Sequence, residues 1–196
     1  MLATRNMKLY LPFERNANDF SGNGNNGTVY GATLEDGKFG KCLSFDGVDD
    51  YVSIPQVNFA VGNTLIMKAY LYDITTTGYI FGGGGLYGIR YNGISLLAIN
   101  ADSGFTTINY TKIDAFITLA ITRPYTNKVN WYINSDYLGQ TSCGSSNNLN
   151  INLIGRRGSG SFYYSRVKLD NIQLYDKLIS VTDLKRIHLG LHPLNG

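Results

Sequence analysis

Short apolar segments separated by turn residues follow one another along this chain, and this pattern restricts the possible folds more than any other feature. In the second half, such segments occupy residues 94–100, 105–110, 115–123 and 128–133. Their lengths and spacing are typical of β-strands, and no helical period interrupts them. A succession of short strands with turns between them predicts two β-sheets packed face to face.

Residues 41–55 (KCLSFDGVDDYVSIP) contain two more such segments, joined by a turn rich in aspartate and glycine. Pro55 is expected to end the second segment, because proline cannot donate a hydrogen bond to a sheet. Gly47 can take a positive φ, and the short carboxylates of the turn can accept hydrogen bonds from nearby backbone N–H groups. The stretch therefore predicts two strands joined by a tight reversal.

Composition favours strands and turns over a helical bundle. Hydrophobic residues make up 43% of the 196 residues and charged residues 16%, with 15 tyrosines, 9 phenylalanines and 23 glycines. This length fits one domain over residues 1–196, long enough to bury a complete sandwich core. Cys42, in a predicted strand, is expected to be a core thiol without a disulfide partner, and Cys143 an inert thiol in a loop.

The low net charge and the short apolar segments argue against nucleic acids and membranes as partners. The formal charge of +3 is small, and the basic residues are scattered apart from short pairs such as Arg156 and Arg157, so a nucleic-acid partner is not indicated. No apolar run approaches the roughly 20 residues that cross a bilayer, so we expect no membrane insertion. Residues 1–16 lack the basic start, apolar stretch and cleavage site of an export signal.

The chain resembles a known family along nearly its whole length. The resemblance lies in DFSGNGNNGTVYG (19–31), FDGVDDYVSIP (45–55), ITLAITR (117–123), VNWYINSDYL (129–138) and LDNIQLYDKLISVTDLKRIH (169–188). These stretches resemble laminin-G-like modules, of the laminin G and pentraxin type, in the concanavalin A-like jelly-roll superfamily. The resemblance implies an all-β, two-sheet antiparallel jelly-roll sandwich, with the first strand (8–13) beside the last long one (167–175). Such sandwiches serve lectins, adhesion modules, enzymes and structural proteins, so the fold leaves the role open.

One short C-terminal helix is predicted over residues 181–189. Ser180 can cap its N-terminus, and Asp183, three residues later, approximates a capping box. His188 and His192 are four residues apart, but Gly190 ends the helix before the second of them, so we expect no zinc site there. The helix is expected to pack its apolar side on the sandwich.

The loop over residues 16–27 has two interpretations. Its asparagine, aspartate and serine side chains can bond their own backbone, which would make it a structured connection. Alternatively, oxygens of Asp19 and Asn23 can bind a hard cation such as calcium. The family resemblance implies Asp170, on the closing strand, as a further ligand. Structural calcium, held by Asp19, Asn23 and Asp170, is therefore the one cofactor that we consider.

The residues that catalysis would need are missing from the sequence. Glycoside hydrolases of this superfamily rely on two facing carboxylates, commonly glutamates at alternating positions of one strand. This chain has two glutamates, Glu14 and Glu35, both near predicted loops of the N-terminal part. Both histidines lie in the C-terminal tail, away from the strands where a nucleophilic triad would be built. We therefore expect no enzyme activity.

Binding remains as the function. Sugar recognition in such folds uses aromatic faces, together with polar groups for the hydroxyls, and adjacent arginines can hold a carboxylate or phosphate. Packing in the core or between subunits is the alternative for each aromatic residue, and a solvated turn is the alternative for the arginines. The candidate binding residues are Tyr79, Tyr87, Tyr91, Trp131, Arg156 and Arg157, with Tyr163 and Tyr164 as further aromatics.

Two functions from different classes fit these observations. We favour a non-catalytic structural or adhesion module, most simply a viral (phage) virion component that decorates a capsid or forms part of a fibre. Such a chain would be assembled in the host cytoplasm and would contact protein partner chains as a homo-oligomer or particle, with host glycans as a second ligand. The support is the missing export signal, the free thiols and the few charges. The alternative is an extracellular, carbohydrate-binding, lectin-like module.

Overall fold

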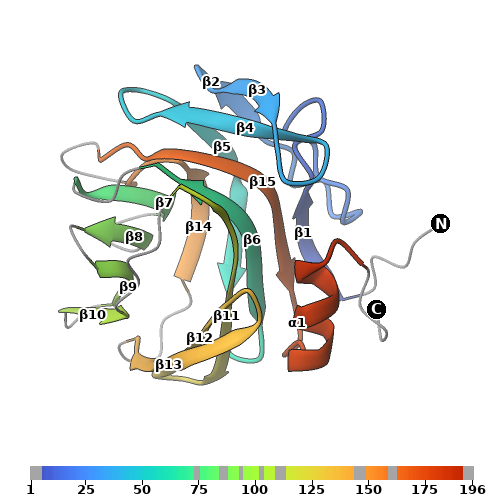
Figure 1. Ribbon diagram of the computed structural model, residues 1–196. Coiled ribbons are helices and arrows are strands. Elements are labelled where there is room, and N and C mark those ends of the chain that lie inside the picture. The colour runs from blue at the N-terminus through green and yellow to red at the C-terminus, as the bar shows by residue number, and fades with distance from the viewer. Residues whose placement is uncertain are drawn as a thin grey trace.

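Two antiparallel β-sheets packed face to face form the protein, as the succession of short apolar segments predicts (Figure 1). The computed structural model describes residues 6–72, 76–83, 88–92, 95–101, 104–108, 114–143, 149–158 and 163–191. One short helix near the C-terminus accompanies the sheets, so the expected all-β sandwich is confirmed.

The first sheet contains eight of the described strands. Its order is β13-β12-β11-β6-β15-β4-β3, and β1 pairs with β15. The strands are β1 (Met7–Leu11), β3 (Thr33–Asp36), β4 (Lys41–Asp46), β6 (Thr64–Leu71), β11 (Phe116–Tyr125), β12 (Lys128–Ile133), β13 (Asp136–Ser142) and β15 (Arg166–Tyr175). The predicted neighbourhood of the first strand and the last long strand is confirmed by the β1–β15 pair.

The second sheet has the order β10-β9-β8-β7-β14-β5-β2. Its strands are β2 (Thr28–Tyr30), β5 (Tyr51–Phe59), β7 (Gly78–Gly82), β8 (Gly88–Asn92), β9 (Ser95–Ala101), β10 (Gly104–Ile108) and β14 (Leu149–Ile154). The expectation that Pro55 ends a strand is wrong, because β5 continues to Phe59. The register between β5 and β14 shifts between Ile151 and Leu153, opposite Pro55, so the ladder tolerates a residue without an N–H there.

Successive side chains along β6 point to opposite faces of the first sheet. Leu65 and Met67 belong to the core between the sheets, whereas Ile66 belongs to a second apolar cluster with Leu184 and Ile187. That cluster holds the helix α1 (Val181–His188) against the outer face of the first sheet (Figure 1). No helix in the described part of the chain is long and apolar enough to cross a membrane.

The start of α1 has the predicted cap. The backbone N–H of Asp183 donates to the Ser180 hydroxyl at 3.1 Å, and that hydroxyl lies 3.0 Å from the Asp183 carboxylate. These contacts satisfy an N–H group that the first helical turn leaves without an intrahelical partner. The capping signal in the sequence therefore located the helix correctly.

Candidate ligand-binding surface

Arginine and tyrosine side chains form a row across the outer face of the second sheet. Tyr51 on β5 and Tyr79 on β7 point away from the core, because their neighbours Val52 and Ile80 point into it. Arg156 follows the end of β14, which lies between β5 and β7. We call the following set the arginine–tyrosine row: Tyr30, Tyr51, Arg156, Arg157, Tyr163, Tyr79 and Arg90.

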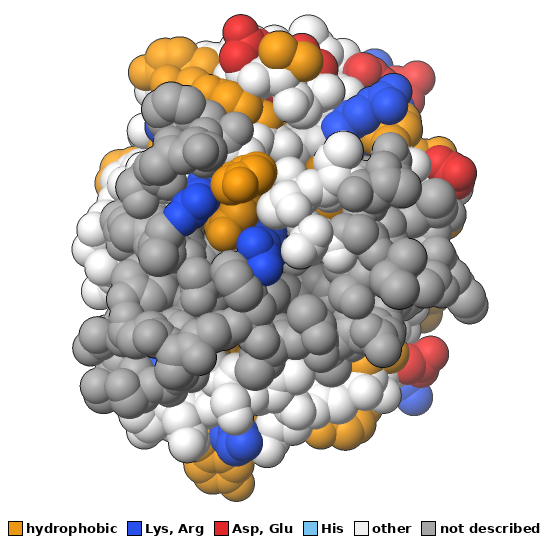
Figure 2. All heavy atoms as spheres, turned by 90° about the vertical axis from the view of Figure 1, so that its left-hand side faces the viewer, with side chains coloured by type: hydrophobic (Ala, Val, Ile, Leu, Met, Phe, Trp, Pro, Cys, Tyr) orange, Lys and Arg blue, Asp and Glu red, His pale blue; other side chains and the backbone are white. Residues whose placement is uncertain are grey.

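Short ring and guanidinium distances connect the members of the row. The rings of Tyr30 and Tyr51 are stacked, with centroids 4.4 Å apart and 9° between their planes. The guanidinium carbon of Arg156 lies 4.5 Å from the Tyr51 centroid, which is well within cation–π range. Figure 2 shows this side of the molecule, where basic side chains flank a small group of hydrophobic ones.

The second half of the row is centred on Tyr79. Its ring lies 5.9 Å from the guanidinium carbon of Arg90, its cross-strand neighbour on β8. The guanidinium carbon of Arg157 lies 5.8 Å from the centroids of both Tyr79 and Tyr163. Two arginines therefore approach one buried tyrosine, and Tyr163, which is 39% exposed, lies at the surface beside them.

Glycines position the two adjacent arginines over the sheet. A Cβ on Gly82 of β7 would collide with the backbone carbonyl of Arg156 and lie 2.9 Å from the N–H of Gly158. Gly155 adopts a φ of +88°, and a Cβ there would lie 2.6 Å from the Phe45 ring. The backbone after β14 can approach β7 this closely only because both positions are glycine.

The chemistry of the row suits an anionic, ring-shaped ligand. A guanidinium that packs its face against an aromatic ring keeps its N–H groups in plane, where they can bind a carboxylate in a bidentate manner. The Nε atom of Arg157 has no hydrogen-bond acceptor among the described residues. Tyr30 and Tyr163 expose part of their rings beside these groups. The row therefore offers both cationic edges and aromatic faces to a ligand.

Two of the predicted aromatic binding residues lie in the core. Trp131 on β12 is 0% exposed, and its Nε1 donates to Thr141 Oγ1 at 2.7 Å. Tyr91 is 1% exposed, and its hydroxyl accepts from the backbone N–H of Arg166 at 2.9 Å. This burial contradicts the prediction that these two residues present faces to a ligand, because core packing takes up their rings. Tyr79, a member of the arginine–tyrosine row, is also buried, and Tyr87 lies outside the described residues.

The predicted calcium ligands bond the backbone. One Asp19 carboxylate oxygen accepts from the N–H groups of Tyr10 and Ser21, at 3.0 and 2.9 Å, and the other accepts from the N–H of Asn25 at 2.9 Å. Burial raises the pKa of Asp19, but these hydrogen bonds outweigh it and lower the pKa below its ordinary value. The Asn23 amide donates to the Met7 carbonyl at 2.8 Å. These contacts fit a structured connection.

Asp170, the third predicted calcium ligand, accepts a hydrogen bond from the backbone N–H of Phe39 at 2.9 Å. Backbone N–H groups therefore donate hydrogen bonds to carboxylate oxygens of both Asp19 and Asp170. These N–H groups occupy positions around the oxygens that a bound cation would need. They compete with a cation for the same oxygens, and structural calcium stays a prediction. No step of the function proposed below uses it.

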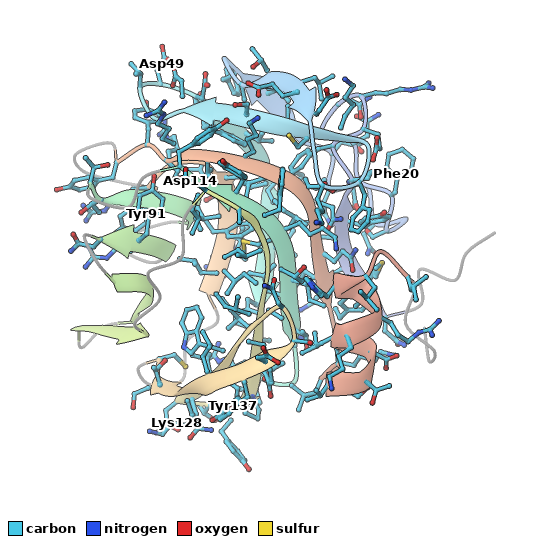
Figure 3. The ribbon with its side chains drawn as sticks, viewed as in Figure 1. Phe20, Asp49, Tyr91, Asp114, Lys128 and Tyr137 are labelled. Atoms are coloured by element: carbon cyan, nitrogen blue, oxygen red, sulfur yellow. The ribbon has the colours of Figure 1, made fainter. Side chains whose placement is uncertain are left out.

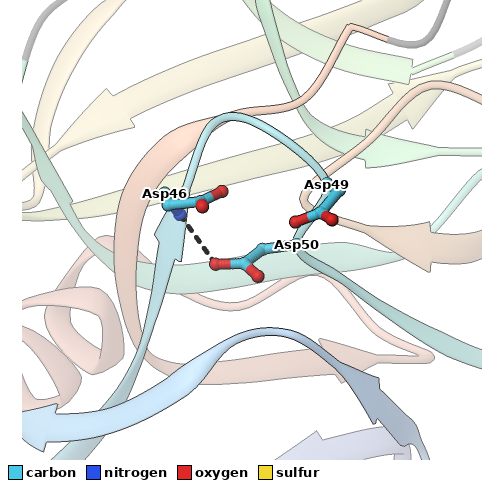
Figure 4. A group of neighbouring side chains, drawn as sticks. All are labelled: Asp46, Asp49 and Asp50. Atoms are coloured by element: carbon cyan, nitrogen blue, oxygen red, sulfur yellow. Dashed lines mark hydrogen bonds between the residues drawn. The ribbon is translucent and has the colours of Figure 1, made fainter.

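A separate group of carboxylates lies in the turn between β4 and β5 (Figure 4). In the described part of the chain, Asp46, Asp49 and Asp50 are the one set of three potential metal-binding side chains whose ligand atoms lie within 4.8 Å of one another. Asp50 accepts from the N–H of Asp46 at 2.8 Å, and Asp46 accepts from the N–H of Val48 at 2.7 Å. The predicted turn chemistry is confirmed, and it accounts for two of the three carboxylates.

Comparison with known proteins identifies the fold. No family model and no curated protein sequence matches the chain. Among solved structures, domain 4 of an extracellular GH43 arabinanase from Geobacillus stearothermophilus, in complex with arabinotriose, matches with a TM-score of 0.71 and 15% identity. That match covers 91% of this chain and 96% of the arabinanase domain.

Two longer proteins contain the same fold. A Trypanosoma rangeli sialidase in complex with sialic acid matches with a TM-score of 0.70 and 16% identity over 94% of this chain and 33% of the sialidase. Botulinum neurotoxin type C, whose cell entry depends on two ganglioside molecules, matches with a TM-score of 0.73 and 12% identity. This match covers 96% of this chain and 52% of the toxin chain. At such identities the likeness establishes the β-sandwich fold alone, without singling out the laminin-G-like type.

Proposed function

We propose that the protein is a non-catalytic glycan-binding module that recognises acidic sugars through the arginine–tyrosine row. The observation that carries this proposal is the placement of Arg156 and Arg157 against tyrosine rings on one face of the sandwich. An acidic sugar has a carboxylate for the guanidinium N–H groups and an apolar ring face for a tyrosine. The sugar ligands of the arabinanase domain and the sialidase support a glycan as the ligand class.

The contacts of the two glutamates support the absence of catalysis. Glu35 forms an ion pair with Lys168 at 2.7 Å, and the hydrogen bond from Lys168 lowers the pKa of Glu35 below its ordinary value. A carboxyl group with a lowered pKa is a poor proton donor near neutral pH. Glu14 accepts from the backbone N–H of Lys41 at 3.0 Å. Neither glutamate therefore has the environment of a general acid.

Replacing Arg157 by alanine is expected to weaken the binding of an acidic glycan by about tenfold to a hundredfold, the effect of losing a charge-assisted hydrogen bond. The ligand pair is sialyllactose and lactose, which differ by the acidic sugar, and the measurement is isothermal titration calorimetry. Wild-type protein is expected to prefer sialyllactose. Arg157→Lys is expected to weaken binding as well, because lysine keeps the charge but loses the planar, bidentate geometry.

Lys185→Ala is the matched control, because it removes one positive charge from the exposed side of α1, far from the row. It is expected to leave sialyllactose binding unchanged. Equal affinity for sialyllactose and lactose, or an Arg157→Ala variant that binds like the wild type, would show that the row does not recognise acidic sugars.

A virion subunit that contacts partner chains is the second candidate. It is favoured by exposed aromatic side chains at one end of the first sheet, where Tyr137 on the edge strand β13 is 57% exposed and its ring centroid lies 5.4 Å from that of Tyr132 on β12 (Figure 3). Tyr125, at the end of β11, is 63% exposed. Exposed aromatics of this kind are enriched where proteins meet. The two chemistries are compatible, because an assembled particle can also bind glycans.

Light scattering during size-exclusion chromatography tests this candidate, which predicts an oligomer that Tyr125→Ser and Tyr137→Ser together convert to a monomer. A wild-type monomer at all accessible concentrations would contradict self-assembly through this edge. The two candidate functions imply different locations. A subunit of an assembled particle would be part of a virion, and a free lectin-like module would be extracellular.

A further inference from the structure

A pocket of about 310 Å³ lies on the opposite side of the sandwich from the arginine–tyrosine row. Its lining residues come from β1 and the residues after it, from Phe39 between β3 and β4, from β6 and β15, and from the end of α1. Figure 1 labels these elements. Tyr10, Glu14, Lys68, Asp170 and Asn171 contribute to its walls. Its volume is at the lower end of the roughly 300–1,000 Å³ typical of ligand pockets, which suits a ligand as small as one sugar ring.

A β-bulge in β15 brings two polar side chains into this pocket together. The register between β15 and β6 shifts between Leu169 and Asn171. Leu169 and Ile172 both belong to the core, so the two residues between them, Asp170 and Asn171, both face outward. In a regular strand one of these two would point into the core. The bulge therefore places a carboxylate and an amide next to each other in the pocket wall.

Glycines make room for the groups that line the pocket. A Cβ on Gly37 would lie 2.7 Å from the Asp170 carboxylate, and a Cβ on Gly40 would lie 2.5 Å from the Glu14 carboxylate. Both glycines belong to the loop that closes one side of the pocket. Such short distances would force the carboxylates to move. The loop therefore has its glycines at the two positions where any side chain would disturb an acidic group of the pocket.

The lysine in the pocket has protein partners for its N–H groups. Lys68 is 2% exposed, and its ammonium donates to the Ile187 and His188 carbonyls at 2.7 and 3.2 Å. The same ammonium lies 4.6 Å from the centroid of the Phe39 ring. Burial lowers the pKa of Lys68 to about 8, so the group is still charged at neutral pH. The Lys68 ammonium therefore donates to carbonyl groups at the C-terminal end of α1, where the helix dipole favours a cation.

Hydrogen-bond acceptors are in surplus at the pocket wall. The Oδ1 atom of Asn171 is buried in the pocket wall and has no hydrogen-bond partner among the described residues, and the Nδ2 atom donates to Asp170 at 3.3 Å. Glu14 is exposed, and the hydrogen bond from the Lys41 N–H uses only one of its two oxygens. A ligand that suits this wall must therefore donate hydrogen bonds, as the hydroxyl groups of a sugar do.

The charges restrict the ligand further. An anion in the pocket would meet the carboxylates of Glu14 and Asp170, and a cation would meet the ammonium of Lys68. An uncharged ligand avoids both repulsions. Apolar side chains at the rim, including Phe39 and Leu189, are partly exposed and can pack against the C–H face of a ring.

We infer that this pocket is a second ligand site, separate from the row, that binds one neutral sugar residue through Glu14, Asp170 and Asn171. The two sites differ in chemistry, since the row uses cationic groups and the pocket uses acceptors. They lie on opposite faces of the sandwich, so a protein with both could bind an acidic glycan on one side and a neutral one on the other. The pocket does not depend on the proposed function of the row.

NMR titration of the ¹⁵N-labelled protein with galactose, glucose, mannose and arabinose tests the site. At least one of these sugars is expected to shift the backbone amide signals of Phe39, Gly40 and Gly190, with saturation at millimolar concentration. Asn171→Ala and Glu14→Gln are each expected to weaken this binding by about tenfold, the effect of one lost hydrogen bond to a sugar hydroxyl. Thermal melting of both variants shows that they are folded.

Gln140→Ala, which removes an exposed amide from β13, is the matched control and is expected to leave the titration unchanged. The four sugars are neutral and the row is tested with sialyllactose, so failure of the row and failure of the pocket can be told apart. The inference is wrong if none of the four sugars moves these signals, or if both pocket variants bind like the wild type. It is also wrong if galactosamine binds more tightly than galactose, because a cationic ligand would then be preferred over a neutral one.

Discussion

Trp131→Ala is expected to lower the free energy of unfolding by about 3–5 kcal/mol, the range found when a large buried aromatic side chain is removed. Trp131 belongs to the core between the sheets, and its Nε1 has a hydrogen-bond partner in Thr141 on the neighbouring strand. The truncation leaves a cavity and removes this bond. For a chain of this length the melting temperature should fall by roughly 6–20 °C. Chemical denaturation and calorimetry measure both quantities.

Two comparison variants separate a core role for Trp131 from a binding role. Trp131→Phe should remain folded with a smaller loss of stability, and it should bind sialyllactose like the wild type. Tyr137→Ala removes an exposed aromatic ring and should change stability by no more than about 0.5 kcal/mol. If Trp131→Phe were as stable as the wild type but lost glycan binding, Trp131 would be a ligand contact after all.

The stability of the protein is expected to rise relative to that of a Lys68→Met variant as the pH increases from about 8 to about 10. Burial lowers the pKa of Lys68 from its ordinary value of 10.5 to about 8, with partial compensation from Asp170 and a further lowering by Lys38. Between these two pKa values the unfolded chain holds a proton that the folded chain has released. Raising the pH therefore favours the folded state, by at most about 1.4 kcal/mol per pH unit.

Urea unfolding of both proteins at several pH values measures this difference. Methionine has a similar volume and no charge, so tyrosines that titrate at higher pH affect both proteins alike and cancel. Below about pH 8 the difference should be nearly constant, because Lys68 is protonated in both states. A difference that falls as the pH rises would mean that the buried ammonium is stabilised, and that the pKa of Lys68 is raised.

The elements of the fold follow from signals between residues that are close together in the chain. The capping pair of Ser180 and Asp183 located the helix, and the Asp-Gly turn after β4 has the predicted backbone hydrogen bonds. Such features depend on residues within four positions of each other, so no tertiary contact is needed to anticipate them. The expectation that Pro55 ends a strand is wrong because of a strand that is distant in the sequence. The register of β14 shifts opposite Pro55, so β5 can continue past the proline.

The candidate sites were only partly predictable. Arg156 and Arg157 stand out in the sequence as two adjacent arginines in a predicted exposed turn, but Arg90 and Tyr51, which complete the row, do not stand out. The alternation of apolar and polar residues in their strands could have indicated that Arg90 and Tyr51 point outward. Two consecutive polar residues, Asp170 and Asn171, in an otherwise alternating strand could have indicated the bulge that builds the pocket. Cys143, expected to be an inert thiol in a loop, directly follows β13, and its side chain packs into the core.

The sequence by itself determined where the strands, the main turn and the helix lie, because hydrophobic alternation, glycine conformation and helix capping act between residues close together in the chain. Only the tertiary structure decided which aromatic rings are buried and which polar groups meet. The hydrogen bond that positions Asp170 in the pocket joins it to Phe39, 131 positions away. Contacts of that kind arise when the two sheets and the helix pack together, and no local pattern encodes them.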